Sequence, residues 1–161
     1  MKKTFLAAVT IAAIFFLFTS ARYEAPAGDR AGGRAPGLTL TEGDSELSLQ
    51  DFRGEHVLLT FWSSTDPESR IANLRYDRIA RASGAVRHVA INYDPSGAVF
   101  GEVVRADALE RSSQRRDNGG SRSQIFRAYK LDKGFRTVLI DPDGVVIAVN
   151  PTLDQIAAAA R

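Results

Sequence analysis

The stretch that decides the fold is FWSSTDPESR, residues 61–70, in which an apolar run ends in two aromatic residues and leads directly into a helix start that contains proline. The preceding HVLLTFW, residues 56–62, is a continuous apolar run of the length expected for a strand buried on both faces. From residue 67 to 82 the apolar residues follow helical spacing. Such a junction often carries chemistry, because the exposed N–H groups of a helix N-terminus stabilise negative charge.

The rest of the chain predicts further strands and helices in an alternating order. Residues 38–54 predict two short strands around a turn at 42–44, and residues 86–94 predict a second central strand. Helices are expected at about 98–109 and 121–130, with a polar loop at 111–120 between them. RTVLIDPDGVVIAVNP, residues 136–151, predicts a hairpin, and Thr152 caps a last helix over 153–160. This order predicts an α/β domain in which helices flank a central mixed sheet.

The N-terminus predicts export. Two lysines precede an apolar run over residues 5–18 and a small-residue exit at 19–21, which is the pattern of a secretory signal peptide. An uncleaved membrane anchor is the alternative for residues 1–21. We expect residues 22–37, rich in Pro, Gly and Ala, to form a flexible linker, and residues 38–161 to form one domain.

Charge and sulfur content exclude several kinds of function. After residue 21 the chain has 19 basic and 19 acidic residues, so it offers no broad positive surface for nucleic acid. The chain contains no cysteine, and its single methionine is the first residue. A mature domain of this composition has neither disulfides nor thiol chemistry.

The junction and its surroundings resemble the thioredoxin fold. The similarity is to the exported, TlpA-like thiol-disulfide interchange proteins related to the alkyl hydroperoxide reductase/thiol-specific antioxidant group. In that group a strand ending in Phe-Trp leads into Cys-x-x-Cys and a basic residue, and here Phe61, Trp62 and Arg70 match. LSLQDFRGEHVLLTFW upstream and LIDPDGVVI downstream resemble the group's lead-in and hairpin, so the resemblance covers about residues 38–150. It implies a thioredoxin-like fold with a central mixed sheet that ends in a hairpin and a C-terminal helix.

The resemblance fails at the residues that perform the family's chemistry. Asp66-Pro67-Glu68-Ser69 stands where the family has Cys-x-x-Cys, and Phe135 stands where it has a cis-proline. Disulfide exchange and peroxide reduction both need a thiolate, which neither a carboxylate nor a serine hydroxyl replaces. We therefore expect no catalytic residue of the family's type here.

Helix capping explains the same four residues without any activity. Asp66 is a favoured N-cap and Pro67 suits the first helical position. Alternatively, Thr65 is the cap and Glu68 completes a capping box. Acidic residues in the first turn also complement the helix dipole.

Other kinds of site have weaker support. A hydrolase would need His56 or His88 beside Ser69, but both histidines are expected near the opposite end of the parallel strands. A metal site could be imagined at Asp141 and Asp143 with Asp94 or Glu68, but the turn lacks the further ligands of a calcium loop and aspartates are normal turn formers. The Gly119-Gly120 pair does not make a phosphate motif. We expect no metal and no cofactor.

A partner-binding surface is the remaining functional hypothesis. In the thioredoxin fold partners dock around the helix start and the cis-proline loop, which here implies Trp62, Thr65, the Asp66-Pro67 start, Phe135 and Arg136. Aromatic and Arg side chains are common anchors of interfaces. The hypothesis is a redox-inactive module that binds an unidentified protein or peptide of the cell envelope, with contact to the membrane only through an uncleaved N-terminal segment. The alternative is an oxidoreductase that depends on a partner's thiols or on a bound cofactor.

Overall fold

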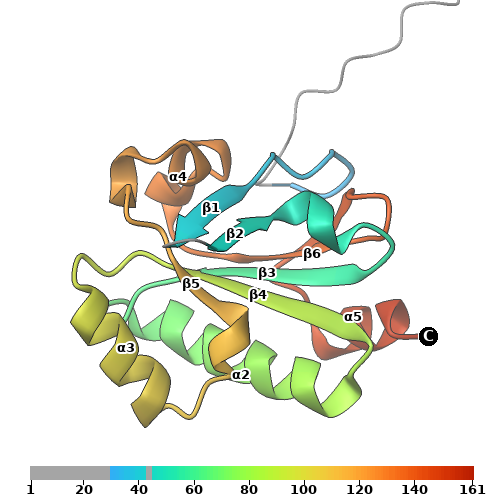
Figure 1. Ribbon diagram of the computed structural model, residues 1–161. Coiled ribbons are helices and arrows are strands. Elements are labelled where there is room, and N and C mark those ends of the chain that lie inside the picture. Colours follow the sequence, from blue (N-terminus) through green and yellow to red (C-terminus); the bar gives the residue numbers. More distant parts are fainter. Residues whose placement is uncertain (1–29, 43–44) are drawn as a thin grey trace, which may run out of the picture.

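The structure is a computed structural model that describes residues 30–42 and 45–161. Its centre is a five-stranded mixed sheet in the order β5-β4-β3-β6-β7 (Figure 1). β3, β4 and β5 are parallel, whereas β6 is antiparallel to β3 and β7 to β6. The five strands are β3 (His56–Trp62), β4 (Val86–Asn92), β5 (Gln114–Arg116), β6 (Thr137–Ile140) and β7 (Val146–Val149). A separate antiparallel pair is formed by β1 (Thr39–Glu42) and β2 (Ser45–Ser48).

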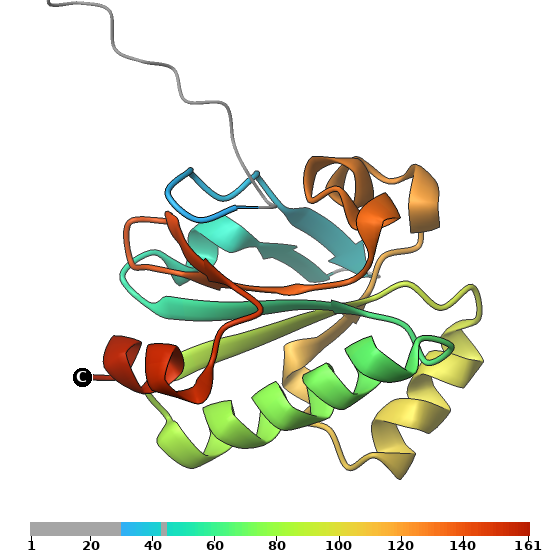
Figure 2. The same ribbon diagram turned by 180° about the vertical axis from the view of Figure 1, so that it is seen from behind.

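Helices and the β1–β2 pair cover the two faces of this sheet. The helices are α2 (Pro67–Ser83), α3 (Gly97–Ala106), α4 (Gln124–Ala128) and α5 (Leu153–Ala159). Short 3-10 helices are η1 (Leu49–Phe52), η2 (Arg111–Ser113), η3 (Gly120–Arg122) and η4 (Leu131–Lys133). Figures 1 and 2 show α2, α3 and α5 on one face, and the β1–β2 pair with α4 on the other.

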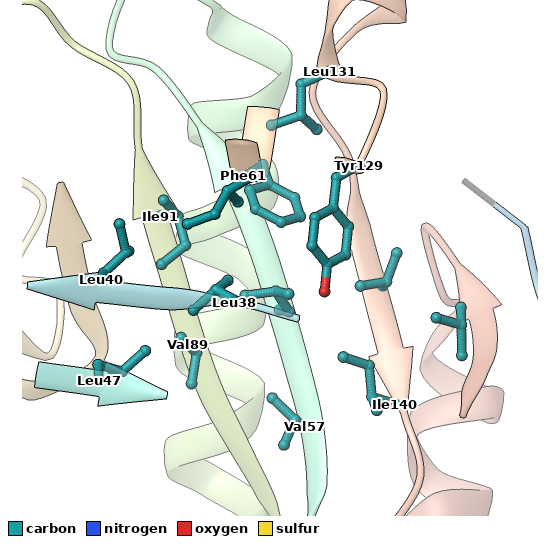
Figure 3. Close-up of a cluster of buried hydrophobic side chains, with 14 residues drawn as sticks. Leu38, Leu40, Leu47, Val57, Phe61, Val89, Ile91, Tyr129, Leu131 and Ile140 are labelled. Carbon is teal, nitrogen blue, oxygen red and sulfur yellow. The ribbon is translucent and has the colours of Figure 1, made fainter. Parts of the chain in front are cut away.

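The alternation of side chains along β3 builds a core on each face. Leu59 and Phe61 belong to the large cluster under β1, β2 and α4, together with Tyr129 (Figure 3). Leu58 packs on the opposite face against Tyr76 of α2. β3 is thus buried on both faces, as its continuous apolar run predicts.

The predicted boundaries of α2 and of the hairpin are confirmed. α2 begins after Asp66 and ends at Gly84, whose φ of +63° is the left-handed conformation that favours glycine. At the hairpin turn Gly144 N–H donates to Asp141 O at 2.9 Å, and Asp141 N–H donates to Val145 O at 2.9 Å. Thr152 caps α5 through its hydroxyl, which accepts from Gln155 N–H at 3.3 Å.

Two expectations for residues 111–130 are wrong in part. The predicted loop at 111–120 contains β5, which pairs with β4 although Gln114-Arg115-Arg116 has no apolar residue. Gln114 is fully buried and its side-chain amide donates to and accepts from the amide of Asn73, so a polar strand enters the sheet. The helix predicted at 121–130 is the shorter α4, with η3 before it and η4 after it.

The expected linker is ordered where the structure describes it. Gly32 N–H donates to Val146 O at 2.8 Å, Val146 N–H to Gly33 O at 2.9 Å, and Ala35 N–H to Gly144 O at 2.9 Å. Residues 32–35 therefore lie along the hairpin, and the flexible linker over residues 22–37 as a whole stays a prediction. The predicted signal segment, residues 1–21, lies outside the described residues. Within 30–42 and 45–161, no helix is both long and apolar enough to cross a membrane.

Candidate functional site

Asp66 caps α2 at the junction between β3 and the helix. Its backbone is extended and its Oδ1 accepts from Ser69 N–H at 2.8 Å, while Pro67 takes the first helical position. The Thr65 hydroxyl instead contacts Ser63 Oγ at 2.9 Å, so Asp66 is the cap and Thr65 is not. Glu68 is exposed in the first turn, where its charge complements the helix dipole.

Ser69 is buried, and its hydroxyl is held by the main chain. Ser69 Oγ accepts from Ser63 N–H at 3.2 Å and donates to Asp66 O at 3.1 Å. No histidine takes part in this arrangement. The hydroxyl thus joins the end of β3 to the first turn of α2, and it lacks the base that a nucleophilic serine needs.

The two histidines lie towards the other end of the parallel strands. His56 pairs with Val86 at the start of β3 and β4, whereas Trp62 pairs with Asn92 at their end. His88 is buried, and its Nε2 lies 3.1 Å from Thr60 Oγ1. The positions predicted for the histidines are therefore confirmed, and no catalytic triad with Ser69 exists.

Asp94 is the central acidic residue of this edge, a role that the sequence did not reveal. Its Oδ1 accepts from Ser63 Oγ at 2.6 Å and from Ser64 N–H at 2.8 Å, and its Oδ2 accepts from Asn92 Nδ2 at 3.1 Å. The side chain is 2% exposed. Its position just after β4, at the edge where β3 also ends, is the signal that could have placed it beside the junction.

The loop before β6 closes the site from the other side of β3. Phe135 is half-buried and stacks on Tyr93, with ring centroids 5.7 Å apart. Arg136 Nη2 donates to Lys130 O at 3.0 Å and to Gly134 O at 3.1 Å, while Arg136 O accepts from Phe61 N–H at 2.9 Å. Every peptide bond in the described residues is trans, including the one before Phe135.

The expected partner-binding surface is only partly accessible. Trp62 is fully buried and packs against Phe100 of α3, with ring centroids 6.2 Å apart. It is therefore a core residue, because β3 is covered on both faces up to its last position. Thr65 and Pro67 are exposed, and Phe135 and Arg136 are partly exposed.

An ion pair fixes the start of α2 to the end of α3. Arg70 Nε and Nη2 donate to the two carboxylate oxygens of Asp107 at 2.8 and 2.7 Å. The pKa of Arg70 is raised, chiefly by this hydrogen bonding and despite some desolvation. The basic residue that follows Ser69 thus positions the helix.

The residues considered for metal or anion binding have structural roles. Asp141 Oδ1 accepts from Val145 N–H at 2.8 Å within the hairpin turn. Over residues 30–42 and 45–161, no group of three or more His, Asp or Glu side chains is arranged to hold a metal ion. Arg116 Nη1 donates to Asp94 O at 3.2 Å, and Gly120 belongs to η3.

Solved structures with the same architecture identify the fold. A thioredoxin-like protein from Parabacteroides distasonis is 29% identical and superposes with a TM-score of 0.71, over 84% of this chain and 97% of that one. The thioredoxin domain of a thiol-disulfide oxidoreductase from Bacteroides vulgatus is 20% identical, with a TM-score of 0.65 over 80% and 94% of the two chains. A thiol-disulfide oxidoreductase from Bacteroides fragilis is 22% identical, with a TM-score of 0.65 over 78% and 95%.

No protein-family model matches the sequence, and no curated protein matches it. The fold is nevertheless clear from the order of the strands, the position of the junction at the end of β3, and the solved structures. The chain has a thioredoxin-like fold and contains no cysteine.

Proposed function

We propose that this protein is a redox-inactive thioredoxin-like module, exported to the cell envelope, that binds another protein or a peptide through the surface around the start of α2. The proposal rests on the burial and the hydrogen bonds of the Ser69 hydroxyl. Its hydroxyl is buried and engaged by Ser63 N–H and Asp66 O, in a chain without cysteine. The side chain at this junction therefore bonds to neighbouring residues and supplies no thiol for a reaction.

The structural relatives support a binding role at the same place. Two of the similar structures are thiol-disulfide oxidoreductases, and disulfide exchange requires a substrate sulfur to lie against the enzyme's thiolate. A chain that keeps this fold but lacks thiols retains the means of presenting a docking surface. Here that surface consists of Thr65, Pro67, Phe135 and Arg136, which we call the junction surface.

Export is supported by the sequence of residues 1–21. Mass spectrometry of the protein isolated from its host identifies the first residue of the mature chain. We expect it at position 22. A protein that retains residues 1–21 and sediments with membranes would instead support the anchored form.

An activity assay tests the first half of the proposal. The purified protein is expected not to accelerate the reduction of insulin disulfides by dithiothreitol or thioredoxin reductase above the rate without the protein, and to give no peroxidase turnover. Turnover that depends on a cysteine-containing partner protein would favour the alternative, an oxidoreductase that uses a partner's thiols. Turnover by the protein alone would overturn the proposal.

Site-specific crosslinking tests the second half. A photoreactive residue at Thr65 is expected to capture a defined envelope protein in cells, whereas one at the exposed Ala158 of α5 does not. Phe135→Ala should weaken the capture at Thr65, because the ring forms part of the junction surface. Equal capture from both positions would show that this surface has no specific partner.

A further inference from the structure

The edge of β4 is only partly covered by β5. β5 pairs with Ala90, Ile91 and Asn92, while residues 86–89 of β4 pair with β3 alone. Asn92 O accepts from Asp117 N–H beyond β5, so the main-chain groups of Asn92 point to this edge. Since these groups alternate along a strand, those of Val86 and His88 point to the same edge and meet no strand there.

A cleft of about 610 Å³ follows this uncovered edge. α2 forms one wall, and β2, η1 and the segment up to His56 form the other. Residues 86–89 line its base, and residues 110–115 bound it near β5. In Figure 1 this half of β4 runs past the end of β5 between the helical layer and β2. The volume lies within the range typical of ligand sites in proteins.

His88 contributes a buried polar atom without a partner to the cleft. The residue is 6% exposed and lines the cleft, and its Nδ1 has no hydrogen-bond partner. Thr60 Oγ1 accepts from Thr137 Oγ1 at 3.1 Å, which leaves the Thr60 proton for His88 Nε2. With Nε2 as the acceptor, the ring proton lies on Nδ1, which is 3.8 Å from Asp77 Oδ1 and beyond hydrogen-bond distance. Buried donors of this kind normally have an acceptor.

Each arginine of the cleft lies near an acidic side chain. Arg81 contacts Asp77 at 3.2 Å, Arg87 contacts Glu55 at 3.0 Å, and Arg115 lies 3.9 Å from Glu42. These pairs leave no excess of positive charge for an anion. An uncharged ligand rich in hydrogen-bonding groups fits better, and a peptide main chain is such a ligand.

We propose that an extended peptide segment of a partner protein binds in this cleft as an added strand beside residues 86–89. Its main chain bonds to the N–H and C=O groups of Val86 and His88, and a hydroxyl or carboxamide oxygen of the peptide accepts from His88 Nδ1. Addition of a strand to an open sheet edge is a common mode of peptide recognition. Four residues of strand span about 13 Å.

Two other occupants fit the cleft less well. In a second copy of this chain the same edge is also recessed between α2 and η1, so the two edges cannot meet. The N-terminal part of this chain enters along β7, at the opposite side of the sheet, where Gly32 bonds to Val146. The cleft is also remote from the junction surface, because it lies at the start of β4 and the junction lies at the end of β3.

Peptide selection on the full-length chain in detergent micelles tests the proposal. A phage-displayed library of random heptapeptides is the probe, and an enriched sequence is synthesised with blocked ends. We expect bound peptide to slow hydrogen exchange at the amides of Val86 and His88. Ser112→Trp, which fills the cleft from an exposed position, should weaken binding at least tenfold, while Thr65→Trp at the junction surface should not.

A second variant removes one hydrogen bond without filling the cleft. Val86→Pro deletes an N–H group that points away from β3, at a strand position where proline is tolerated. It should also weaken binding, with the fold checked by circular dichroism. Failure to enrich any peptide would overturn the proposal, as would binding that Thr65→Trp removes and Ser112→Trp leaves intact. A dimer that Ser112→Trp dissociates in sedimentation experiments would assign the edge to a second copy and overturn it as well.

Discussion

Asp66 and Ser69 are both engaged in the hydrogen bonds of a helix start. The Asp66 carboxylate binds one of the free N–H groups of α2, and the Ser69 hydroxyl joins α2 to β3. These hydrogen bonds join residues that are close in the chain, and the Ser69 hydroxyl both donates and accepts. Selection for stability alone is therefore sufficient to explain both residues.

Replacing the cap measures this role directly. Asp66→Ala should lower the free energy of unfolding by about 1 kcal/mol, because the Ser69 N–H loses its acceptor. Asp66→Asn keeps an acceptor and should cost much less. Urea denaturation of the two variants gives both values. Equal losses in the two variants would contradict the capping role.

Asp77 predicts a pH dependence of stability. Burial raises its pKa, but the nearby His88, the Glu110 N–H group and Arg81 outweigh this effect, so the pKa lies below its ordinary value. A carboxylate with a lowered pKa in the folded state stabilises the fold above its unfolded pKa, near 4, and this contribution is lost as the pH falls through the folded value.

Asp77→Asn should therefore destabilise the protein most at neutral pH, by roughly 2 kcal/mol. The difference from the wild type should shrink below about pH 4. Urea denaturation at pH 7 and pH 3.5 measures it, with the exposed Asp154→Asn as a control that should show little change at either pH. A difference that is constant with pH would contradict the direction of the shift.

At the scale of the element, the start of α2 remains suited to thiol chemistry. The double variant Asp66→Cys, Ser69→Cys places two thiols at the first turn of a helix, where the N-terminus lowers a thiol pKa from about 8.5 into the range of about 3.5–7.5. We expect the double variant to reduce insulin disulfides in the presence of dithiothreitol, and the single variant Asp66→Cys to stay inactive. Adding Phe135→Pro supplies the residue that the sequence resemblance implies for this loop and should raise the rate further. A double variant that forms its disulfide and still lacks activity would show that the surrounding loop prevents the reaction.

The elements differ in how well the sequence predicts them. α2, the central strands and the hairpin follow from apolar periodicity, the Asp-Pro start and the Asp-Pro-Asp-Gly turn, since each has a strong local signal. β5 has no such local signal. Its Gln114 is buried because its side-chain amide pairs with that of Asn73, 41 residues away in the chain. Likewise Asp94 and the half-buried Phe135 obtain their roles from contacts across the sheet edge. Sequence reasoning thus finds the junction but misses the polar residues that stabilise it.

At the scale of the whole molecule, the segment of residues 30–37 is part of the fold. Tyr129 is fully buried and its hydroxyl donates to Pro36 O at 2.8 Å, and burial raises its pKa. Tyr76 makes a matching bond on the other face, to Pro151 O at 3.0 Å. Each tyrosine links a peripheral segment of the chain to one of the two core layers.

Comparison of the two tyrosines isolates the contribution of the N-terminal segment. Tyr129→Phe should cost about 1 kcal/mol of unfolding free energy and accelerate hydrogen exchange in residues 30–37. Tyr76→Phe should cost a similar amount and leave exchange in that segment unchanged. Faster exchange of residues 30–37 in both variants would show that the segment responds only to global stability.

The pairing of residues 32–35 with the hairpin also limits how far the domain can stand from a membrane. If residues 1–21 remain as an anchor, the ten residues 22–31 separate the anchor from Gly32, which bonds to the hairpin. Ten residues span at most about 36 Å, whereas the sixteen residues 22–37, if all were free, would reach about 58 Å. An anchored form would therefore keep the β7 side of the sheet close to the bilayer, and its partners would be restricted to proteins of the membrane surface. Signal cleavage removes this restriction, so the first residue of the mature protein determines the space in which partners are found.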